Sequence, residues 1–261
     1  MNAPLGFQHD IPLDLFALDR LDALCRSAPE GCLKVQLGDD GRERPVGASP
    51  VYSQLEGTLA DDIARRRLHV HLHDVARWAP APYGKAYAGI LEAHGGDSAD
   101  RHAVTTVLRV FSPDVPVALH ADGEIAIDCG VGGRNVWNFY DRTILSDAEH
   151  EGLHRGGQFL RWRDAESVLF DLRPGDACVV PSRWPHWLEH PGPDPAVSFD
   201  IGYWTSAAIR ERKAYDVNFV LRKLHLNPAA PGRRAGRDRA KCDVFDLLSR
   251  ATGKGAEYRG V

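Results

Sequence analysis

The stretch Arg173-Pro-Gly-Asp-Ala-Cys-Val-Val-Pro-Ser-Arg-Trp-Pro-His186 joins a Pro-Gly turn, a short apolar run and a Pro-His step. A short apolar run between such turn signals is typical of a buried β-strand. Short runs separated by Gly, Pro or Asp continue on both sides, at 104–111, 117–122, 125–131, 135–140, 167–172, 177–180 and 196–204. This rhythm predicts an antiparallel barrel or sandwich rather than alternating βαβ units.

The strand-rich region is flanked by segments with helical spacing. The apolar pattern predicts helices at 12–28, 58–67, 82–93 and 206–224, a short last helix at 243–251, and strands at 32–37 and 68–75. The Pro/Gly/Arg-rich segment 227–241 is predicted to be a mobile connector. We therefore expect an N-terminal α/β extension (1–100) packed on a barrel core (101–205), followed by a C-terminal helical extension (206–261).

Composition narrows the class of protein. The chain has 261 residues, 43% of them hydrophobic and 26% charged, as in ordinary globular proteins. Its formal net charge of −4 argues against nucleic acid as the main partner, and no apolar stretch is long enough for a membrane span. The first residues lack the pattern of a signal peptide, and five cysteines without CxxC spacing favour free thiols. We therefore expect a cytoplasmic protein.

The segment His120-Ala-Asp122 carries the chemistry of a metal site. On a strand, side chains two residues apart point to the same side, so His120 and Asp122 share a face. With His186 from a neighbouring strand they would form a 2-His-1-carboxylate face, which holds Fe(II) and leaves positions open for O₂ and substrate. A lone His-x-Asp is common by chance, and its alternative interpretation is a strand with a surface carboxylate.

Several further motifs resemble the bacterial cupin-like branch of the JmjC hydroxylase superfamily. They are Pro116-Val-Ala-Leu-His-Ala-Asp122, Leu145-Ser-Asp147, Leu172-Arg-Pro-Gly175, Pro185-His-Trp187 and Ser198-Phe199. The resemblance implies a double-stranded β-helix, the cupin or jelly-roll barrel, with flanking helices. It also implies iron ligands His120, Asp122 and His186. The implied activity is an Fe(II)- and 2-oxoglutarate-dependent dioxygenase that hydroxylates, or desaturates, a C–H bond.

The sequence departs from the family pattern at several positions. Val117 replaces the hydroxyl residue before the first histidine, Ala126 replaces an Asn, and Asn135 replaces the Lys that would anchor 2-oxoglutarate. In the second cupin motif, Arg183 stands where a Gly is usual. The co-substrate anchors are therefore altered, while the metal ligands are retained.

A dicarboxylate bound inside an apolar barrel requires a cationic partner. Arg109 and Arg134 are the two candidates, together with Asn135 at the family's position. Each arginine also has an alternative interpretation as part of a salt bridge at the barrel rim.

Aromatic residues are the candidate walls of a substrate pocket: Trp137, Trp184, Trp187 and Tyr203. Trp184 and Trp187 flank His186 in a predicted loop. The histidines at 69, 71 and 73 lie along one strand face that spans about 13 Å, too far for all three to reach one ion. His190 is expected in the second shell or on the surface.

The residues described above are compatible with three functions. The first is the Fe(II)/2-oxoglutarate oxygenase, acting with O₂ on a small-molecule or peptide substrate. The second is a cupin-type metal-dependent dioxygenase that does not use 2-oxoglutarate. The third is a catalytically silent binding or regulatory protein. The amphipathic helix at 206–224 is a candidate homodimer surface.

Overall fold

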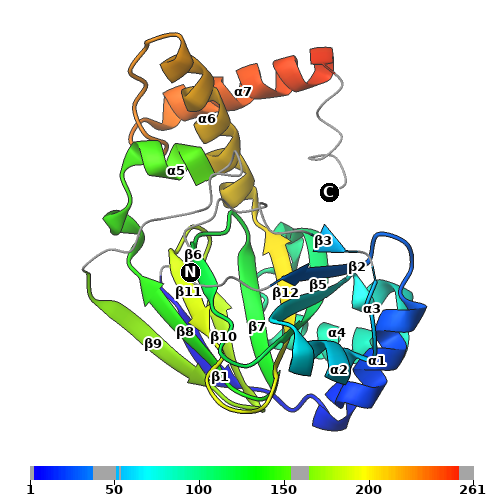
Figure 1. Cartoon of the computed structure of the whole chain (residues 1–261). Helices are drawn as coiled ribbons and strands as arrows, with labels where there is room; N and C mark the ends of the chain where they lie inside the picture. The colour runs from blue at the N-terminus through cyan, green and yellow to red at the C-terminus, as the bar shows by residue number, and fades with distance from the viewer. Residues whose placement is uncertain (1–2, 38–50, 53, 154–164, 253–261) are drawn as a thin grey trace.

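The computed structural model describes residues 3–37, 51–52, 54–153 and 165–252 of the chain. Within them, two antiparallel β-sheets face each other (Figure 1). The larger sheet has the strand order β1 (Leu5–Gln8), β10 (Asp176–Val180), β7 (Ile125–Gly132), β12 (Ala196–Trp204), β5 (His102–Phe111), β4 (Leu68–His73), β2 (Leu33–Leu37) and β3 (Val51–Tyr52). The smaller sheet has the order β6 (Val117–His120), β11 (His186–Glu189), β8 (Asn135–Tyr140) and β9 (Ser167–Leu172).

Strand alternation gives the larger sheet two different faces. On β12, Phe199, Ile201 and Tyr203 pack into a core shared with the N-terminal helices. Because successive side chains point to opposite faces, Ser198 and Asp200 face the smaller sheet across the barrel interior. The apolar face therefore holds the fold together, and the polar face is available to the site.

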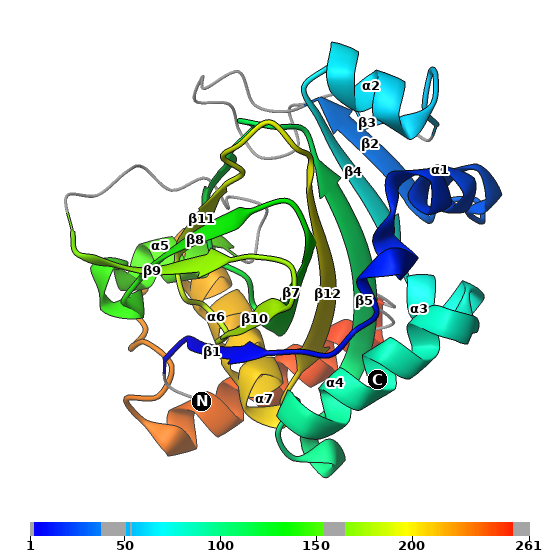
Figure 2. The ribbon, with the colours of Figure 1, turned by 90° about the horizontal axis from the view of Figure 1, so that it is seen from below.

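Helices cover the outer face of the larger sheet (Figure 2). They are η1 (Leu13–Phe16), α1 (Leu18–Ser27), α2 (Leu59–Arg65), α3 (Val75–Trp78), η2 (Pro80–Gly84) and α4 (Lys85–His94), with the turn η3 (Ser98–Asp100) following. The turn η4 (Arg142–Ile144) and the helix α5 (Asp147–Leu153) connect β8 to the segment before β9. Within the described ranges, no helix combines the length and the apolar character needed to cross a membrane.

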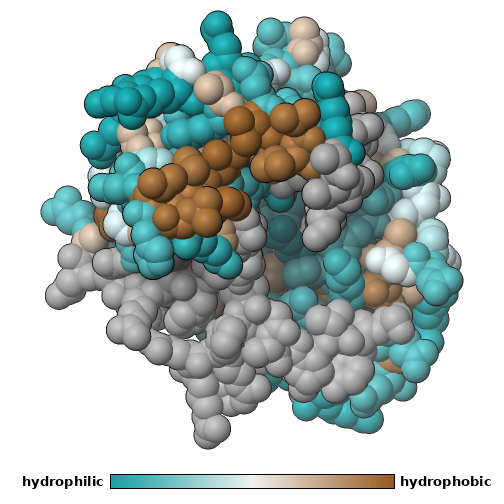
Figure 3. Space-filling view, turned by 90° about the horizontal axis from the view of Figure 1, so that it is seen from above, coloured by the Kyte–Doolittle hydropathy of each residue, from teal (hydrophilic) through white to brown (hydrophobic). Residues whose placement is uncertain are grey.

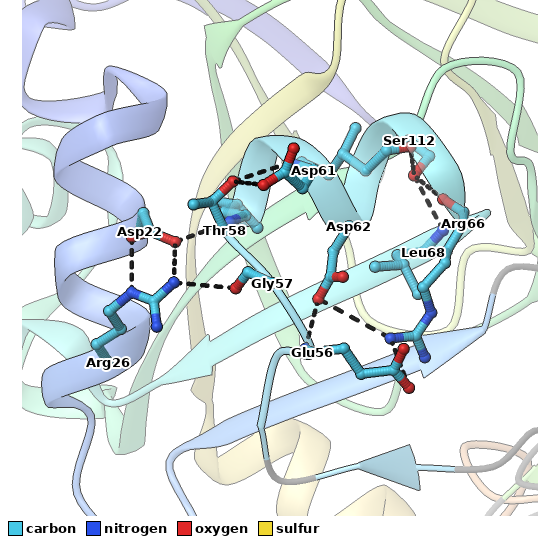
Figure 4. A network of polar contacts seen from close by, with 12 residues as sticks. Asp22, Arg26, Glu56, Gly57, Thr58, Asp61, Asp62, Arg66, Leu68 and Ser112 are labelled. Carbon is cyan, nitrogen blue, oxygen red and sulfur yellow. Dashed lines mark hydrogen bonds and ion pairs between the residues drawn. The ribbon is translucent and has the colours of Figure 1, made fainter.

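A polar network ties α2 to α1 and to the larger sheet (Figure 4). Asp22 on α1 accepts a hydrogen bond from the backbone N–H of Leu59 (2.7 Å) and pairs with Arg26 (2.8 Å). The Thr58 hydroxyl accepts from the N–H of Asp61 (3.1 Å) and so caps the N-terminus of α2. At the other end, the Ser112 hydroxyl accepts from the N–H of Leu68 (2.9 Å). The helix layer is therefore anchored by side chains as well as by apolar packing.

The C-terminal segment differs from the prediction. Helix α6 (Ser206–Lys223) follows β12 as expected, but α7 (Ala235–Thr252) begins inside the predicted connector 227–241. Ala, Arg and Lys have high helix propensity, and Asp238 accepts from the N–H of Gly232 (2.8 Å) in the turn before the helix. An apolar patch lies on this end of the molecule (Figure 3). The exposed large apolar residues of α6 and α7 are Val220, Val244, Leu247 and Leu248, with Leu224 just after α6.

The strand β11 is a further correction. The sequence predicts a loop around Trp184 and Trp187, because prolines and aromatic residues interrupt the alternation there. The structure instead begins a strand at His186, which pairs with both β6 and β8. His186 is therefore the first residue of an inner strand of the smaller sheet.

Candidate metal centre

The predicted triad is brought together at one end of the smaller sheet. β6 ends at His120 and β11 begins at His186, and the two histidines are cross-strand partners. Asp122 Oδ2 lies 3.7 Å from His120 Nε2 and 3.6 Å from His186 Nε2. One ligand atom from each residue lies within 4.8 Å of the others, and the residues that the structure describes contain no second such group. Two imidazoles and one carboxylate match the donor set of a non-heme Fe(II) site.

Backbone carbonyls fix the orientation of both imidazoles. His120 Nδ1–H donates to the carbonyl of Ala118 (2.8 Å), and His186 Nδ1–H donates to the carbonyl of Trp184 (2.8 Å). A carbonyl can only accept, so Nδ1 carries the proton and Nε2 keeps its lone pair. Such hydrogen bonds orient metal-binding histidines in known sites. The lone pair of each Nε2 atom is therefore available to bind a metal.

The electrostatics of the triad favour the ligand forms of its side chains. Burial lowers the pKa of His186 to about 3, with the nearby His120 acting in the same direction. Burial alone would raise the pKa of Asp122, but the two imidazoles and Arg109 more than offset it and the pKa falls. Near neutral pH, His186 is therefore neutral and Asp122 is an anion. The Asp122 side chain is 33% exposed and that of His186 only 1%, so the triad is more open to solvent on the side of the carboxylate.

The larger sheet supplies a polar wall opposite the triad. Arg109 on β5 points into the barrel, and its Nη1 lies 2.7 Å from Asp200 Oδ2 on β12. Asp200 is the cross-strand partner of Asp128 on β7. Burial and the neighbouring Asp200 raise the pKa of Asp128 well above its ordinary value, which favours the protonated form of this carboxyl group. Arg109 therefore pairs with Asp200 in a wall where the neighbouring Asp128 favours its neutral form.

Glu124 adds a further titrating group beside this wall. A Cβ placed on Gly202 would lie 2.9 Å from the Glu124 carboxyl, so the carboxyl packs directly over the glycine on β12. Burial and the nearby Asp122 raise the pKa of Glu124 to about 7. The absence of a side chain at position 202 makes room for this carboxyl.

The smaller sheet supplies an apolar wall. The rings of Trp137 and Phe139 lie 5.0 and 5.8 Å from the ring of His186. Val117 and Ala126, two of the positions that depart from the family pattern, pack against the same cluster. These side chains exclude water from one side of the triad. The indole N–H of Trp137 is the one hydrogen-bond donor among these four side chains, and it has no partner within the described residues.

The three candidate co-substrate residues end in different places. Arg109 faces the barrel interior, as described above. Asn135 is fully buried, and its Nδ2–H donates to the carbonyl of Val197 (3.4 Å). Arg134 lies outside the barrel, where it binds both carboxylate oxygens of Asp171 (2.7 and 2.9 Å). Asn135, the first residue of β8, points inward, and Arg134 before it points outward, so of the three candidates Arg109 and Asn135 face the barrel interior.

The four candidate pocket aromatics also divide. Trp137 and Trp184 belong to the apolar cluster inside the barrel. Trp187 follows His186 on a strand and therefore faces outward, into a separate cluster with Leu119, Ala121, Tyr140 and Leu145. Tyr203 packs on the helix-facing side of the larger sheet. Trp187 and Tyr203 therefore face away from the interior cluster that contains Trp137 and Trp184, because side chains alternate between the two faces of a strand.

Three further histidines, His69, His71 and His190, lie beside Phe111. His69 and His71 make edge contacts with the Phe111 ring (5.0 and 6.3 Å), and the His190 ring stacks on it at 4.0 Å. Burial lowers the pKa of His69 to about 4 and that of His190 to about 3, so both are neutral near pH 7. His190 is thus a packing residue of the interior and is not exposed.

Sequence reasoning missed Phe139, Glu124, Asp128 and Asp200. The signal for the two aspartates was present, since each is a lone carboxylate inside an otherwise apolar strand. A charged residue in such a run is costly to bury unless it is paired. Pairing Asp128 with Asp200 requires the strand order, which the sequence does not contain.

The two sheets and the triad define a double-stranded β-helix of the cupin or jelly-roll type, with a His-Asp-His site at the mouth. This confirms the fold expected from the sequence motifs. No family model matches the sequence, and no curated protein matches it.

Solved structures of YcfD from Escherichia coli are similar to this chain. One of them aligns with a TM-score of 0.55 at 15% identity, covering 94% of this chain and 63% of YcfD. A structure of YcfD, described as a ribosomal oxygenase in complex with cobalt and 2-oxoglutarate, aligns with a TM-score of 0.54 at 14% identity, again covering 94% and 63%. The complex with cobalt and succinic acid gives 0.53 at 15% identity. The chain thus spans less than two thirds of YcfD, and the likeness shows the fold.

Proposed function

We propose that this protein is a non-heme Fe(II) oxygenase that uses O₂ and 2-oxoglutarate to hydroxylate, or desaturate, a C–H bond of a small-molecule or peptide substrate. The observation that carries the proposal is the triad, in which Nε2 of His120, Nε2 of His186 and Oδ2 of Asp122 converge. The similarity to YcfD, which has been crystallised with cobalt and 2-oxoglutarate, supports it.

In this proposal each wall of the barrel has a separate task. The triad holds Fe(II), which when bound supplies the activation of O₂ and the oxidation of the 2-oxo acid. Trp137 and Phe139 keep water away from His186 on the apolar side. Glu124, with a pKa near 7, can give or take a proton beside Asp122.

Arg109 is the proposed anchor for the distal carboxylate of 2-oxoglutarate. Its Nη1 is engaged by Asp200, but its buried Nε makes no hydrogen bond within the described part of the chain. An unsatisfied buried donor is unfavourable and indicates that an acceptor binds there. A guanidinium can hold one carboxylate at each edge, so Asp200 does not prevent the binding of a second anion. Asn135, deeper on the smaller sheet, is a proposed minor contact.

A second candidate is a metal-dependent dioxygenase that does not use 2-oxoglutarate. It is favoured by the apolar side chains at Val117 and Ala126 and by the neutralisation of Arg109 by Asp200. The third candidate, a silent binding protein, predicts metal binding without consumption of O₂.

Anaerobic titration followed by turnover separates the three candidates. The Fe(II)-loaded protein is titrated with 2-oxoglutarate by calorimetry, and succinate release and O₂ uptake are then measured in air. Succinate release that requires iron and is lost in His120→Ala supports the proposal. O₂ uptake without 2-oxoglutarate binding supports the second candidate, and metal binding without O₂ uptake supports the third.

Location and assembly complete the proposal. All five cysteines are free thiols, which fits the proposed cytoplasmic location. Helix α7 covers part of α6, so the proposed homodimer surface is the apolar patch of α6 and α7 rather than α6 alone. Neither proposal involves nucleic acid or a membrane.

A further inference from the structure

The segment 181–184 contacts two of the three metal-ligand positions. The Ser182 hydroxyl donates to the carbonyl of Gly123 (2.7 Å), and the backbone N–H of Arg183 donates to the carbonyl of Asp122 (2.7 Å). The carbonyl of Trp184 accepts from Nδ1 of His186 (2.8 Å). The placement of the carboxylate and of one imidazole therefore depends on where this segment lies.

Arg183 holds a backbone conformation that favours glycine. Its φ is +64°, in the left-handed region, where a side chain crowds the following carbonyl. Glycine is the usual residue at this position in the resembling motif. An arginine with this φ is strained, and strain of this kind persists only when surrounding contacts hold it in place.

The contacts that hold Arg183 come from helix α6. The side chain is only 1% exposed, and its Nε lies 3.1 Å from Glu211 Oε2. The guanidinium carbon lies 4.4 Å from the ring centre of Tyr215, one turn further along the helix. Arg142 binds the other oxygen of Glu211 at 2.8 Å. Within the described residues, the three guanidinium nitrogens make no hydrogen bond that meets strict geometry, so the ion pair with Glu211 and the ring of Tyr215 are the contacts that compensate the buried charge. Because both partners lie on α6, they determine where residue 183 can lie.

We propose that Arg183 is a positioning residue through which helix α6 fixes the geometry of the metal site. The side chain links α6 to segment 181–184, and the backbone of that segment holds Asp122 and His186. Consequently the helical segment after the barrel is part of the working site. This inference rests on the metal centre of the proposed function and is independent of 2-oxoglutarate.

The test uses Co(II) as a probe, because its visible absorption spectrum reports the number and arrangement of its ligands. Co(II) affinity and spectrum are measured for wild type, Arg183→Gly and Glu211→Gln. Arg183→Gly accepts the left-handed φ without strain and removes the link to α6. Glu211→Gln keeps the shape of the side chain and removes the charge that holds the guanidinium. Arg183→Lys keeps a cation and should be intermediate.

Glu151→Gln is the matched control. Glu151 is buried and pairs with Arg222 of α6 (Oε2 to Nε, 2.6 Å). Glu151→Gln therefore makes the same substitution as Glu211→Gln, in another ion pair between a buried side chain and α6. No contact described above joins Glu151 to segment 181–184. This variant shows what a weaker attachment of α6 does to the protein in general, and the loss of stability is measured as a fall in melting temperature.

We expect Arg183→Gly and Glu211→Gln to weaken Co(II) binding about 10- to 100-fold, the range typical of residues that orient metal ligands, and to alter the spectrum. Glu151→Gln should keep the wild-type affinity and spectrum even if its melting temperature falls. Wild-type cobalt spectra and affinities in folded Glu211→Gln and Arg183→Gly would overturn the inference while leaving the proposed function intact. A wild-type protein that binds no cobalt overturns both.

Discussion

Removing Arg109 together with its partner charge tests the proposed carboxylate anchor. Arg109→Met alone would leave the Asp200 carboxylate buried and unpaired, which is strongly destabilising. The double variant Arg109→Met/Asp200→Asn removes both charges and keeps similar side-chain volumes. Removing both partners of a pair is far less destabilising than removing one. We therefore expect the double variant to fold, and this is checked by its melting temperature.

The loss in co-substrate affinity follows from the contact that Arg109 is proposed to make. A hydrogen bond to a charged group contributes about 1.5–3 kcal/mol. Because the Arg109 side chain is 29% exposed, solvent screening favours the lower half of this range. At about 1.4 kcal/mol per tenfold, the dissociation constant of 2-oxoglutarate should rise about 10- to 40-fold.

The assay is calorimetric titration of 2-oxoglutarate into the Mn(II)-loaded protein, in which binding is measured without turnover. Arg134→Ala is the control, since Arg134 binds Asp171 on the outside of the hairpin and should leave the affinity unchanged. Wild-type affinity in the folded double variant, or a larger loss in Arg134→Ala, would refute the assignment. The second result would make Arg134, the residue just before the family's position at Asn135, the anchor.

Three further predictions concern the metal, the pH and the assembly. At a metal concentration 100 times its dissociation constant, binding should stabilise the wild type by about 2.7 kcal/mol, and His186→Ala should show no metal-dependent rise in melting temperature. Burial lowers the pKa of His190 to about 3, so below pH 6.5 the unfolded chain takes up a proton that the folded chain does not. As the pH is lowered from 6.5 to about 3, His190 should therefore reduce stability by up to about 1.4 kcal/mol per pH unit, in addition to the slopes from His69 and His186. His190→Phe should make the curve shallower; equal slopes for the variant and the wild type in denaturant titrations would contradict this. If the apolar patch pairs two copies, Leu247→Glu should convert a dimer to a monomer in analytical ultracentrifugation, and a wild-type monomer at high concentration would exclude the dimer.

The strands from Val104 onward could be predicted from the sequence because turn residues and alternation mark their ends. β11 could not, since Pro185 and the two flanking tryptophans hide its alternation. Because this strand was not predicted, the direction of the Trp187 side chain was not predicted either. Side chains alternate between two faces on a strand, but they follow no such rule in a loop. Once β11 is known, the inward His186 requires Trp187 to face outward.

The candidate site divides in the same way. His120 and Asp122 are two residues apart, so their shared direction follows from local geometry alone. The pairing of Asp128 with Asp200, and of Arg183 with α6, depends on which strands and helices are neighbours. Such contacts join segments distant in sequence, and a single sequence contains no record of them. The outward direction of Arg134 follows from that of Asn135, the first residue of β8, but only once the inward face of that strand is known.

The place of β12 between β7 and β5 affects how the protein can fold during its synthesis. β5 and β7 emerge from the ribosome well before β12, yet each must pair with it, and Leu5 of β1 has to wait for Val179 of β10. Contacts between distant segments form slowly, because the chain between them must first be ordered. A nascent chain that ends before residue 196 therefore lacks the centre of its larger sheet and leaves two long strand edges unpaired. Pauses in translation just before this strand should make the nascent chain most dependent on chaperones.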